Sequence, residues 1–332
     1  MRREALILIL ALTLACAPRP EAKTPRVKTA LPASGKDFCG MLLAGGPQLP
    51  VILPPDRPVR VLAFGDFGDG GAEQKKVARA MAEHDRAQPF DFGITLGDNF
   101  YQAGINDPAS PRWARDWELL YDPLGIRVYA TLGNHDYLDP VSPEAEIERS
   151  RRSESWCLPR RYYTFAAGPV QFFALDTDPI ERGEATVAAQ LDWLRRALQS
   201  SPAPWKIVYG HHPVYTNGEH GKDLGYLPRL REKLLPILAE SKVDVYLAGH
   251  DHDLEALNPE GGVTFFVSGG GGKEKRPLRT SRCRAWAESA YGFTVLEATE
   301  KELTVRFFGD GGQPLYETTL RKGETGQDCP RP

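Results

Sequence analysis

The chain has 332 residues, and its 41 Lys and Arg against 44 Asp and Glu leave a formal net charge of −3. Hydrophobic residues make up 41% and charged residues 26%, which suffices for a sizeable core and excludes global disorder. Because this balance offers no basic surface, we expect no nucleic-acid partner.

The first fifteen residues have the pattern of a signal peptide. Arg2 and Arg3 precede an unbroken apolar run over Ala5–Leu12, and that run is far shorter than the ~20 residues that a membrane-spanning helix needs. We therefore expect residues 1–15 to be removed and the protein to be exported.

The residues that follow favour a lipid anchor. Thr13-Leu14-Ala15-Cys16 resembles a bacterial lipoprotein cleavage box with Cys16 as the lipidated residue, although Thr13 stands where that box usually has Leu. Residues 16–50 would then form a tether and N-terminal extension, of which 18–36 are polar and rich in proline. We therefore expect a lipoprotein of the bacterial cell envelope, periplasmic or on the outer surface, that touches membrane only through its anchor. Ordinary cleavage after Ala17, giving a secreted protein, is the alternative.

Export leaves an even set of cysteines for pairing in an oxidising compartment. Of the five in the chain, Cys16 is lipidated or removed, so the remaining ones are Cys39, Cys157, Cys283 and Cys329. Three pairings are open, and one of them joins Cys39 to Cys329 across the two ends of the folded region and Cys157 to Cys283 between two loops. No Cys-x-x-Cys occurs, so the sequence does not support a thiolate zinc site.

From residue 59 onward, short β-branched and aromatic runs alternate with amphipathic segments. The predicted strands are Val59–Gly65, Phe92–Leu96, Arg127–Leu132, Val170–Asp176, Lys206–Tyr209, Val243–Ala248, Val263–Ser268, Gly292–Glu297 and Leu303–Phe308. The predicted helices are Ala72–Ala87, Pro111–Tyr121, Thr186–Ser200 and Leu230–Ser241. Strands and helices alternate in the first half and strands follow one another at the end, which favours two packed sheets with helices outside them. Because no interior linker interrupts this pattern, we predict one catalytic domain over residues 51–332.

Five short motifs stand where predicted strands end, and each joins a glycine to a polar side chain that can bind metal. They are Gly65-Asp66-Phe67-Gly68, Gly97-Asp98-Asn99-Phe100-Tyr101, Gly133-Asn134-His135-Asp136, Gly210-His211-His212-Pro213 and Gly249-His250-Asp251-His252. Open α/β sheets bind their ligands at the carboxyl ends of strands, so we expect the motifs to meet. Five of the seven histidines lie in these motifs, a sixth, His220, follows in a nearby loop, and only His84 falls in a predicted helix.

Such a mixed set of Asp, Asn, Tyr and His ligands could hold two cations if one carboxylate bridged them. Two-metal sites place their ions ~3.5–4 Å apart and clamp both the attacking and the leaving oxygen. This arrangement suits hydrolysis of phosphate esters, whose transition state is mainly a problem of charge distribution.

In this order, over Val59–Leu257, the five motifs resemble those of the metallophosphoesterase superfamily, and within it the purple acid phosphatases. Most of the superfamily has Asp-x-His in the first motif, whereas Asp66-Phe67-Gly68 lacks that histidine and Tyr101 in Gly-Asp-x-x-Tyr replaces it. The loop Glu219-His220-Gly221 is most similar to the small, mammalian-type branch. The resemblance implies an α/β (α+β) fold of four layers, in which two packed mixed β-sheets are flanked by helices.

The resemblance also implies two metal ions bridged by Asp98. The other ligands of a ferric ion would be Asp66, Tyr101 and His252. Those of a divalent ion, which would be iron, zinc or manganese, would be Asn134, His211 and His250. A phenolate from Tyr101 suits a hard ferric ion. Because ferric iron is a stronger Lewis acid than zinc, it would keep a bound hydroxide available in acid.

Two further histidines have implied catalytic roles. His135 would contact substrate and assist the leaving group, and His220 would be the second such residue; an exposed loop histidine is the alternative for His220. We expect His212 to pack beside the site and Asp136 to orient His135.

Two further segments have residues of the kind that bind phosphate. The run Gly269–Gly272 is not a P-loop, because Val267 and Glu274 stand where that motif has Gly and Ser or Thr. The basic segment Arg276–Arg284 either favours anionic substrates or is a solvated loop.

Together these features predict an exported, monomeric, dinuclear-metal acid phosphatase. It would hydrolyse phosphate monoesters of small substrates by attack of a metal-activated hydroxide. One alternative is a phosphodiesterase, nucleotide or pyrophosphate hydrolase on the same scaffold. Another is a lipid-anchored binding protein that retains metal without turnover.

Overall fold

A computed structural model describes residue 39 and residues 57–222, 227–279 and 284–324, which all belong to the unit over residues 34–332. The expected signal peptide, Cys16 and the rest of the expected tether other than Cys39 lie outside the described residues. No helix in the described ranges is long and apolar enough to cross a bilayer.

The strands form two sheets of seven, ordered β14-β13-β12-β1-β2-β3-β4 and β11-β9-β10-β8-β7-β6-β5. The first sheet comprises β1 (Val59–Phe64), β2 (Phe92–Thr95), β3 (Val128–Tyr129), β4 (Trp156–Cys157), β12 (Gly292–Ala298), β13 (Glu302–Gly309) and β14 (Pro314–Arg321). The second comprises β5 (Tyr163–Ala167), β6 (Val170–Ala174), β7 (Trp205–Tyr209), β8 (Val245–Ala248), β9 (Leu254–Glu260), β10 (Val263–Ser268) and β11 (Arg284–Glu288). Both are mixed: β1 runs parallel to β2 and antiparallel to β12, and β8 runs parallel to β7 while β9 runs antiparallel to β10.

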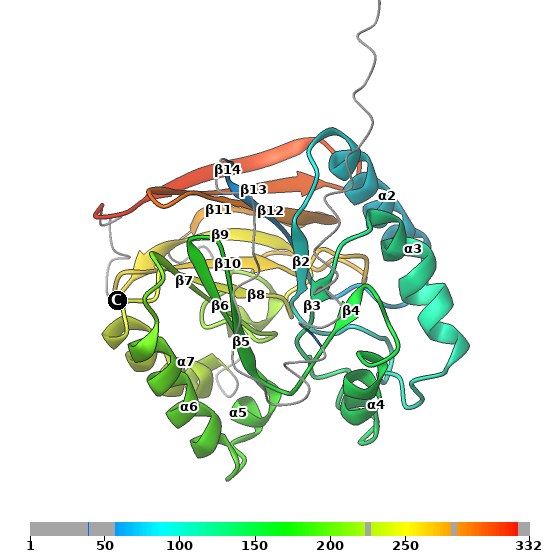
Figure 1. Cartoon of the computed structure of the whole chain (residues 1–332), viewed down its shortest axis with the longest axis horizontal. Coiled ribbons are helices and arrows are strands. Elements are labelled where there is room, and N and C mark those ends of the chain that lie inside the picture. The colour runs from blue at the N-terminus through cyan, green and yellow to red at the C-terminus, as the bar shows by residue number, and fades with distance from the viewer. Residues whose placement is uncertain (1–38, 40–56, 223–226, 280–283, 325–332) are drawn as a thin grey trace, which may run out of the picture. The chain divides into compact units, whose positions relative to one another are not determined.

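Helices flank the sheets, with α2 and α3 on one side and α6 and α7 on the other (Figure 1). The helical elements are α2 (Ala72–Ala87), the π-helix η1 (Trp113–Glu118), α3 (Leu119–Tyr121), the 3-10 turn η2 (Asp122–Leu124), α4 (Ser142–Arg149), α5 (Asp178–Arg182), α6 (Val187–Ser200), the 3-10 turn η3 (Glu219–Lys222) and α7 (Leu227–Glu240). Helix α6 buries Leu191, Leu194 and Leu198, whose spacing of three and four residues puts them on one face. The expected architecture of two mixed sheets with outer helices is confirmed.

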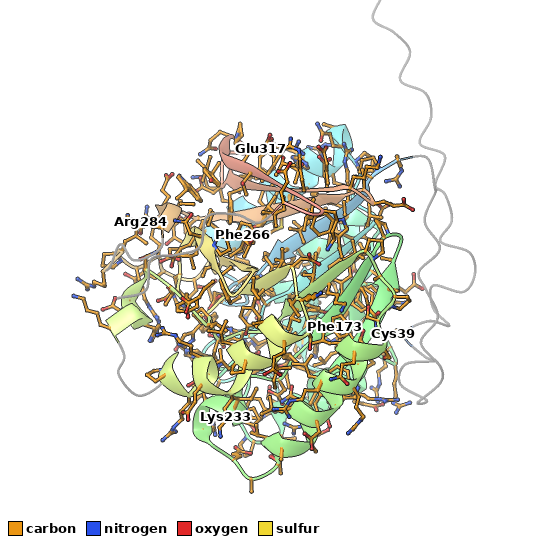
Figure 2. All side chains as sticks on the ribbon, turned by 90° about the vertical axis from the view of Figure 1, so that its left-hand side faces the viewer. Cys39, Phe173, Lys233, Phe266, Arg284 and Glu317 are labelled. Atoms are coloured by element: carbon orange, nitrogen blue, oxygen red, sulfur yellow. A yellow bond between two sulfur atoms is a disulfide. The ribbon has the colours of Figure 1, made fainter. Side chains whose placement is uncertain are left out.

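Alternation along the strands directs successive side chains to opposite faces of a sheet. On β6, Phe172 belongs to an inner cluster that lies between the sheets and extends to α2, and its ring lies 5.4 Å from that of Phe92 on the first sheet. The next residue, Phe173, packs instead with Leu194 and Leu234 of the outer helices. Phe266 on β10 belongs to the inner cluster, and Figure 2 labels both Phe173 and Phe266.

A disulfide joins Cys39 to Cys157 at the end of β4, with the two Cα atoms 6.0 Å apart. The pairing of Cys39 with Cys329 and of Cys157 with Cys283 is therefore wrong; Cys283 and Cys329 themselves lie outside the described residues. Cysteine spacing carries no information about which segments the sheets bring together, so the pairing follows from the fold alone.

Candidate active site

The five glycine-containing motifs follow the carboxyl ends of β1, β2, β3, β7 and β8. Within each sheet these strands run parallel, so their ends meet at one edge. The two sheets meet at this edge as well, because the backbone N–H of His250 donates to Asp66 Oδ2 at 2.9 Å. The structure thus brings all seven predicted ligands into one site.

One group of ligands surrounds the Tyr101 hydroxyl. Its oxygen lies 2.7 Å from Asp98 Oδ2, 3.1 Å from Asp66 Oδ1 and 3.3 Å from His252 Nε2. His252 Nδ1 donates to the Glu274 carbonyl at 2.6 Å, which leaves the lone pair on Nε2 directed into the group. The phenol can donate its one proton to only one of these three acceptors. A cation bound among them would satisfy the lone pairs of the others.

The second group consists of Asn134, His211 and His250. His211 Nε2, Asn134 Oδ1 and His250 Nδ1 lie 3.0–3.1 Å from one another. His211 donates through Nδ1 to the Leu96 carbonyl at 2.9 Å, so its Nε2 is an acceptor that faces the Asn134 oxygen. Two lone pairs at this distance repel unless a positive charge lies between them, and the donor set therefore fits a metal ion.

Asp98 reaches both groups. Its Oδ2 accepts from Tyr101, and its Oδ1 lies 3.4 Å from His211 Nε2. Asp98 could therefore bridge two ions. Buried carboxylate and imidazole groups that could hold metal include the set Asp66, Asp98 and His211.

The electrostatics of the site indicate an unbalanced negative charge. Burial and the charge of Asp98 raise the pKa of Asp66, and burial together with both carboxylates raises the pKa of Tyr101. Burial lowers the pKa of His211, and it lowers the pKa of His252 to about 4, so both imidazoles stay neutral, the form that binds metal. A bound cation would lower the pKa of Asp66 and of Tyr101, and it would leave both imidazoles neutral.

The ligand turns contain strained backbone. Asp66, Asp98 and His250 have φ values of 59°, 51° and 70°, a left-handed conformation that non-glycine residues seldom adopt. Such strain persists only where the surrounding structure imposes it, and it gathers at functional sites.

Two motif glycines leave room for ligand side chains. A Cβ on Gly133 would lie 2.2 Å from Asp98 Oδ1, and one on Gly97 would lie 2.7 Å from the His211 side chain. Gly97 also has a φ of 84°, which a larger residue adopts only with strain. These two motif glycines are therefore required because ligand side chains approach their Cα atoms closely.

Asp136 differs from its predicted role. It does not orient His135, whose Nδ1 donates to the Gln102 carbonyl at 2.6 Å. The Asp136 carboxylate instead accepts from the backbone N–H groups of Asn99, Phe100 and Gly133 at 2.8–3.1 Å. It joins the turn that carries Asp98 and Tyr101 to the turn that carries Asn134, which no spacing in the sequence indicates.

The two candidate catalytic histidines lie next to different ligands. His135 Nε2 lies 4.0 Å from Asp98 Oδ2. The His220 ring lies 4.0 Å from the His250 ring, and its Nε2 lies 2.7 Å from Arg276 Nη1. Arg276 is a site residue that the sequence singled out only as part of a basic segment.

His212 packs beside the site, and its Nδ1 lies 2.9 Å from Thr177 Oγ1. Another tyrosine close to a ligand motif, Tyr137, donates its hydroxyl to Asp176 rather than to a predicted ligand.

A sequence profile of the calcineurin-like phosphoesterase family matches residues 59–254. Purple acid phosphatase 7 of Arabidopsis thaliana is 31% identical over 299 residues, which cover 82% of this chain and 89% of that protein. Tartrate-resistant acid phosphatase type 5 of Sus scrofa is 31% identical over 304 residues, which cover 79% of this chain and 88% of that protein.

Among solved structures, GAP50, described as the anchor in the inner membrane complex of Plasmodium, superimposes with a TM-score of 0.69 at 20% identity, covering 81% of this chain and 90% of that chain. At that identity the likeness is one of fold alone. The sequence relatives decide the family: this chain belongs to the calcineurin-like phosphoesterases and, among them, to the purple acid phosphatases, metal-dependent hydrolases of phosphoric esters.

Proposed function

We propose that this phosphatase hydrolyses phosphate monoesters of small molecules at a centre that pairs a ferric ion with a divalent ion. Membership of the family implies a dinuclear centre that contains iron. The observation that supports the ferric assignment is the Tyr101 hydroxyl, which lies within 3.3 Å of two carboxylates and an imidazole. A phenolate is a hard ligand and suits Fe(III) far better than zinc.

In this proposal Asp98 would bridge the two ions. Asp66, Tyr101 and His252 would be the other residues that hold the ferric ion. Asn134, His211 and His250 would hold the divalent ion, which would be iron, zinc or manganese. When bound, the ions supply Lewis-acid charge for the phosphoryl oxygens and activate a water nucleophile.

The residues around the ions position the substrate and move its proton. Because His135 Nδ1–H is held by the Gln102 carbonyl, a proton carried by His135 sits on Nε2, the nitrogen that faces the site. That proton can pass to the leaving oxygen of the ester. His220 lies against His250, next to the ligands of the divalent ion.

A visible spectrum with Tyr101→Phe tests the centre. Phenolate bound to ferric iron gives a ligand-to-metal charge-transfer band, so the purified protein should be pink to violet and Tyr101→Phe should lack the band even where iron remains. Tyr137→Phe is the matched control, because its hydroxyl bonds Asp176. A colourless wild type that carries two zinc or manganese ions and cleaves a chromogenic phosphate ester at mildly acidic pH would overturn the ferric assignment.

We also propose that the protein is an exported, monomeric lipoprotein anchored through Cys16. The Cys39–Cys157 disulfide supports export, because disulfides persist in oxidising compartments. The mature protein should partition into detergent, and Cys16→Ser should abolish this behaviour. A soluble mature chain that begins at Pro18 would establish ordinary cleavage and a secreted protein.

A further inference from the structure

The segment that follows β10 is attached to the ligand turns of both sheets. The backbone N–H of Lys273 donates to the Asp66 carbonyl at 2.9 Å, and that of Arg276 donates to the His252 carbonyl at 3.2 Å. The Arg276 carbonyl accepts from Ser289 Oγ at 2.6 Å. The position of Arg276 beside the metal ligands is therefore set by its backbone.

The Arg276 side chain donates to a histidine rather than to any carboxylate in the part of the chain that the structure describes. Its Nη1 lies 2.7 Å from His220 Nε2, so the guanidinium donates to a neutral imidazole. No carboxylate among the described residues is ion-paired with it. By contrast, Arg279 of the same segment pairs with Glu219 at 3.1 Å.

Arg276 contacts residues of both ligand groups. Its backbone N–H donates to the carbonyl of His252 in the first group, and its guanidinium donates to His220, whose ring lies 4.0 Å from that of His250 in the second. The guanidinium therefore lies near the predicted ligands of both ions, where the phosphoryl group of a substrate must be placed.

We propose that Arg276 binds the non-bridging phosphoryl oxygens of the substrate and of the product phosphate. The inference rests on the proposed phosphatase function. Its basis is a half-buried guanidinium beside the ligands that forms no ion pair with a carboxylate of the described ranges and already donates to His220. The planar fork of N–H donors matches two phosphate oxygens, which an ammonium group at this position cannot do.

The bond to His220 has a consequence for the two histidines. While Arg276 donates to His220 Nε2, that nitrogen is an acceptor and holds no proton for a leaving group. The proton must then come from His135, and His220 serves to hold the guanidinium over the site. Arg276 is thus a substrate-binding residue and His220 positions it.

The test measures binding of inorganic phosphate to the metal-loaded protein by equilibrium dialysis. A charge-assisted hydrogen bond contributes about 1.5–3 kcal/mol, so Arg276→Met should raise the dissociation constant about tenfold to a hundredfold. Arg276→Lys keeps the charge without the fork and should show an intermediate loss, which decides the matter if Arg276→Met does not fold. Arg279→Met removes the same charge from the same segment and should change the constant less than about threefold, because its rim ion pair is exposed.

Metal content by elemental analysis accompanies every measurement. A wild-type dissociation constant in Arg276→Met and Arg276→Lys, beside an active wild type, would overturn the role of Arg276 and leave the phosphatase function standing. A wild type that holds both metals but binds no phosphate would overturn both. If Arg276 acts only by positioning His220, its effect should vanish in a His220→Ala background, whereas direct binding predicts a further loss there.

Discussion

Replacing Asp136 should weaken both the fold and the metal centre, although Asp136 is no predicted ligand. The carboxylate is fully buried and accepts from the backbone N–H groups of Asn99, Phe100 and Gly133 and from Asn99 Nδ2. Asn99 Nδ2 keeps the Thr131 carbonyl as a second partner at 2.7 Å, so Asp136→Ala leaves three orphaned donors. At about 1–3 kcal/mol for each buried donor, the loss is roughly 3–9 kcal/mol, and water admitted to the space brings it toward the lower end.

The variant Asp136→Asn keeps the shape of the side chain and changes only its hydrogen bonding. Asp136→Asn keeps one acceptor oxygen for Asn99 and Phe100 but turns an amide N–H toward the Gly133 N–H, so we expect a smaller loss of about 1–3 kcal/mol. In Asp136→Ala no carboxylate joins the two turns that carry the metal ligands, so metal affinity should fall about 10- to 100-fold. Urea unfolding and elemental analysis measure the two effects. Asp69→Ala is the control, since Asp69 accepts one backbone bond from Gly71 outside the ligand turns. An Asp136→Ala protein with the wild-type midpoint and full metal content would refute the reasoning.

Three further predictions concern the bridge, the disulfide and pH. Asp98→Ala should lose both metals and activity together, whereas His135→Ala should keep both metals while kcat falls about 10²–10⁴-fold; full metal content in Asp98→Ala would contradict the bridging role. Replacing Cys39 and Cys157 by Ser should lower the free energy of unfolding by about 2–5 kcal/mol, and an unchanged urea midpoint would contradict the pairing. Burial raises the pKa of Glu181 from 4.5 to about 8, so the folded state holds this proton more tightly than the unfolded chain. The resulting stability is fully present below the unfolded pKa and is lost as pH rises through about 8. Between about pH 5 and about pH 8 the free energy of unfolding of wild type should therefore fall more than that of Glu181→Gln. Equal falls with pH in the two proteins would refute this.

Local sequence patterns predicted the elements whose apolar residues recur with the period of a helix or a strand. Helix α2 has the predicted bounds, Ala72–Ala87, because an apolar face repeated every three or four residues is a property of the segment alone. Strands β4, β5, β9, β11 and β14 were not expected. Of these, β11 and β14 lie at sheet edges, where strands are largely exposed and show no apolar run. The five motifs likewise defined the site, because a glycine and a ligand directly after a buried strand are local features.

Tertiary structure decided every contact between the motifs. That Asp136 joins two ligand turns, that Cys39 pairs with Cys157, and that Arg276 donates to His220 are consequences of how the two sheets pack. Residue types and spacing along the chain limit which atoms can bind metal or phosphate. They cannot state which of those atoms come within 3 Å of one another, because that distance depends on the packing of segments far apart in the sequence.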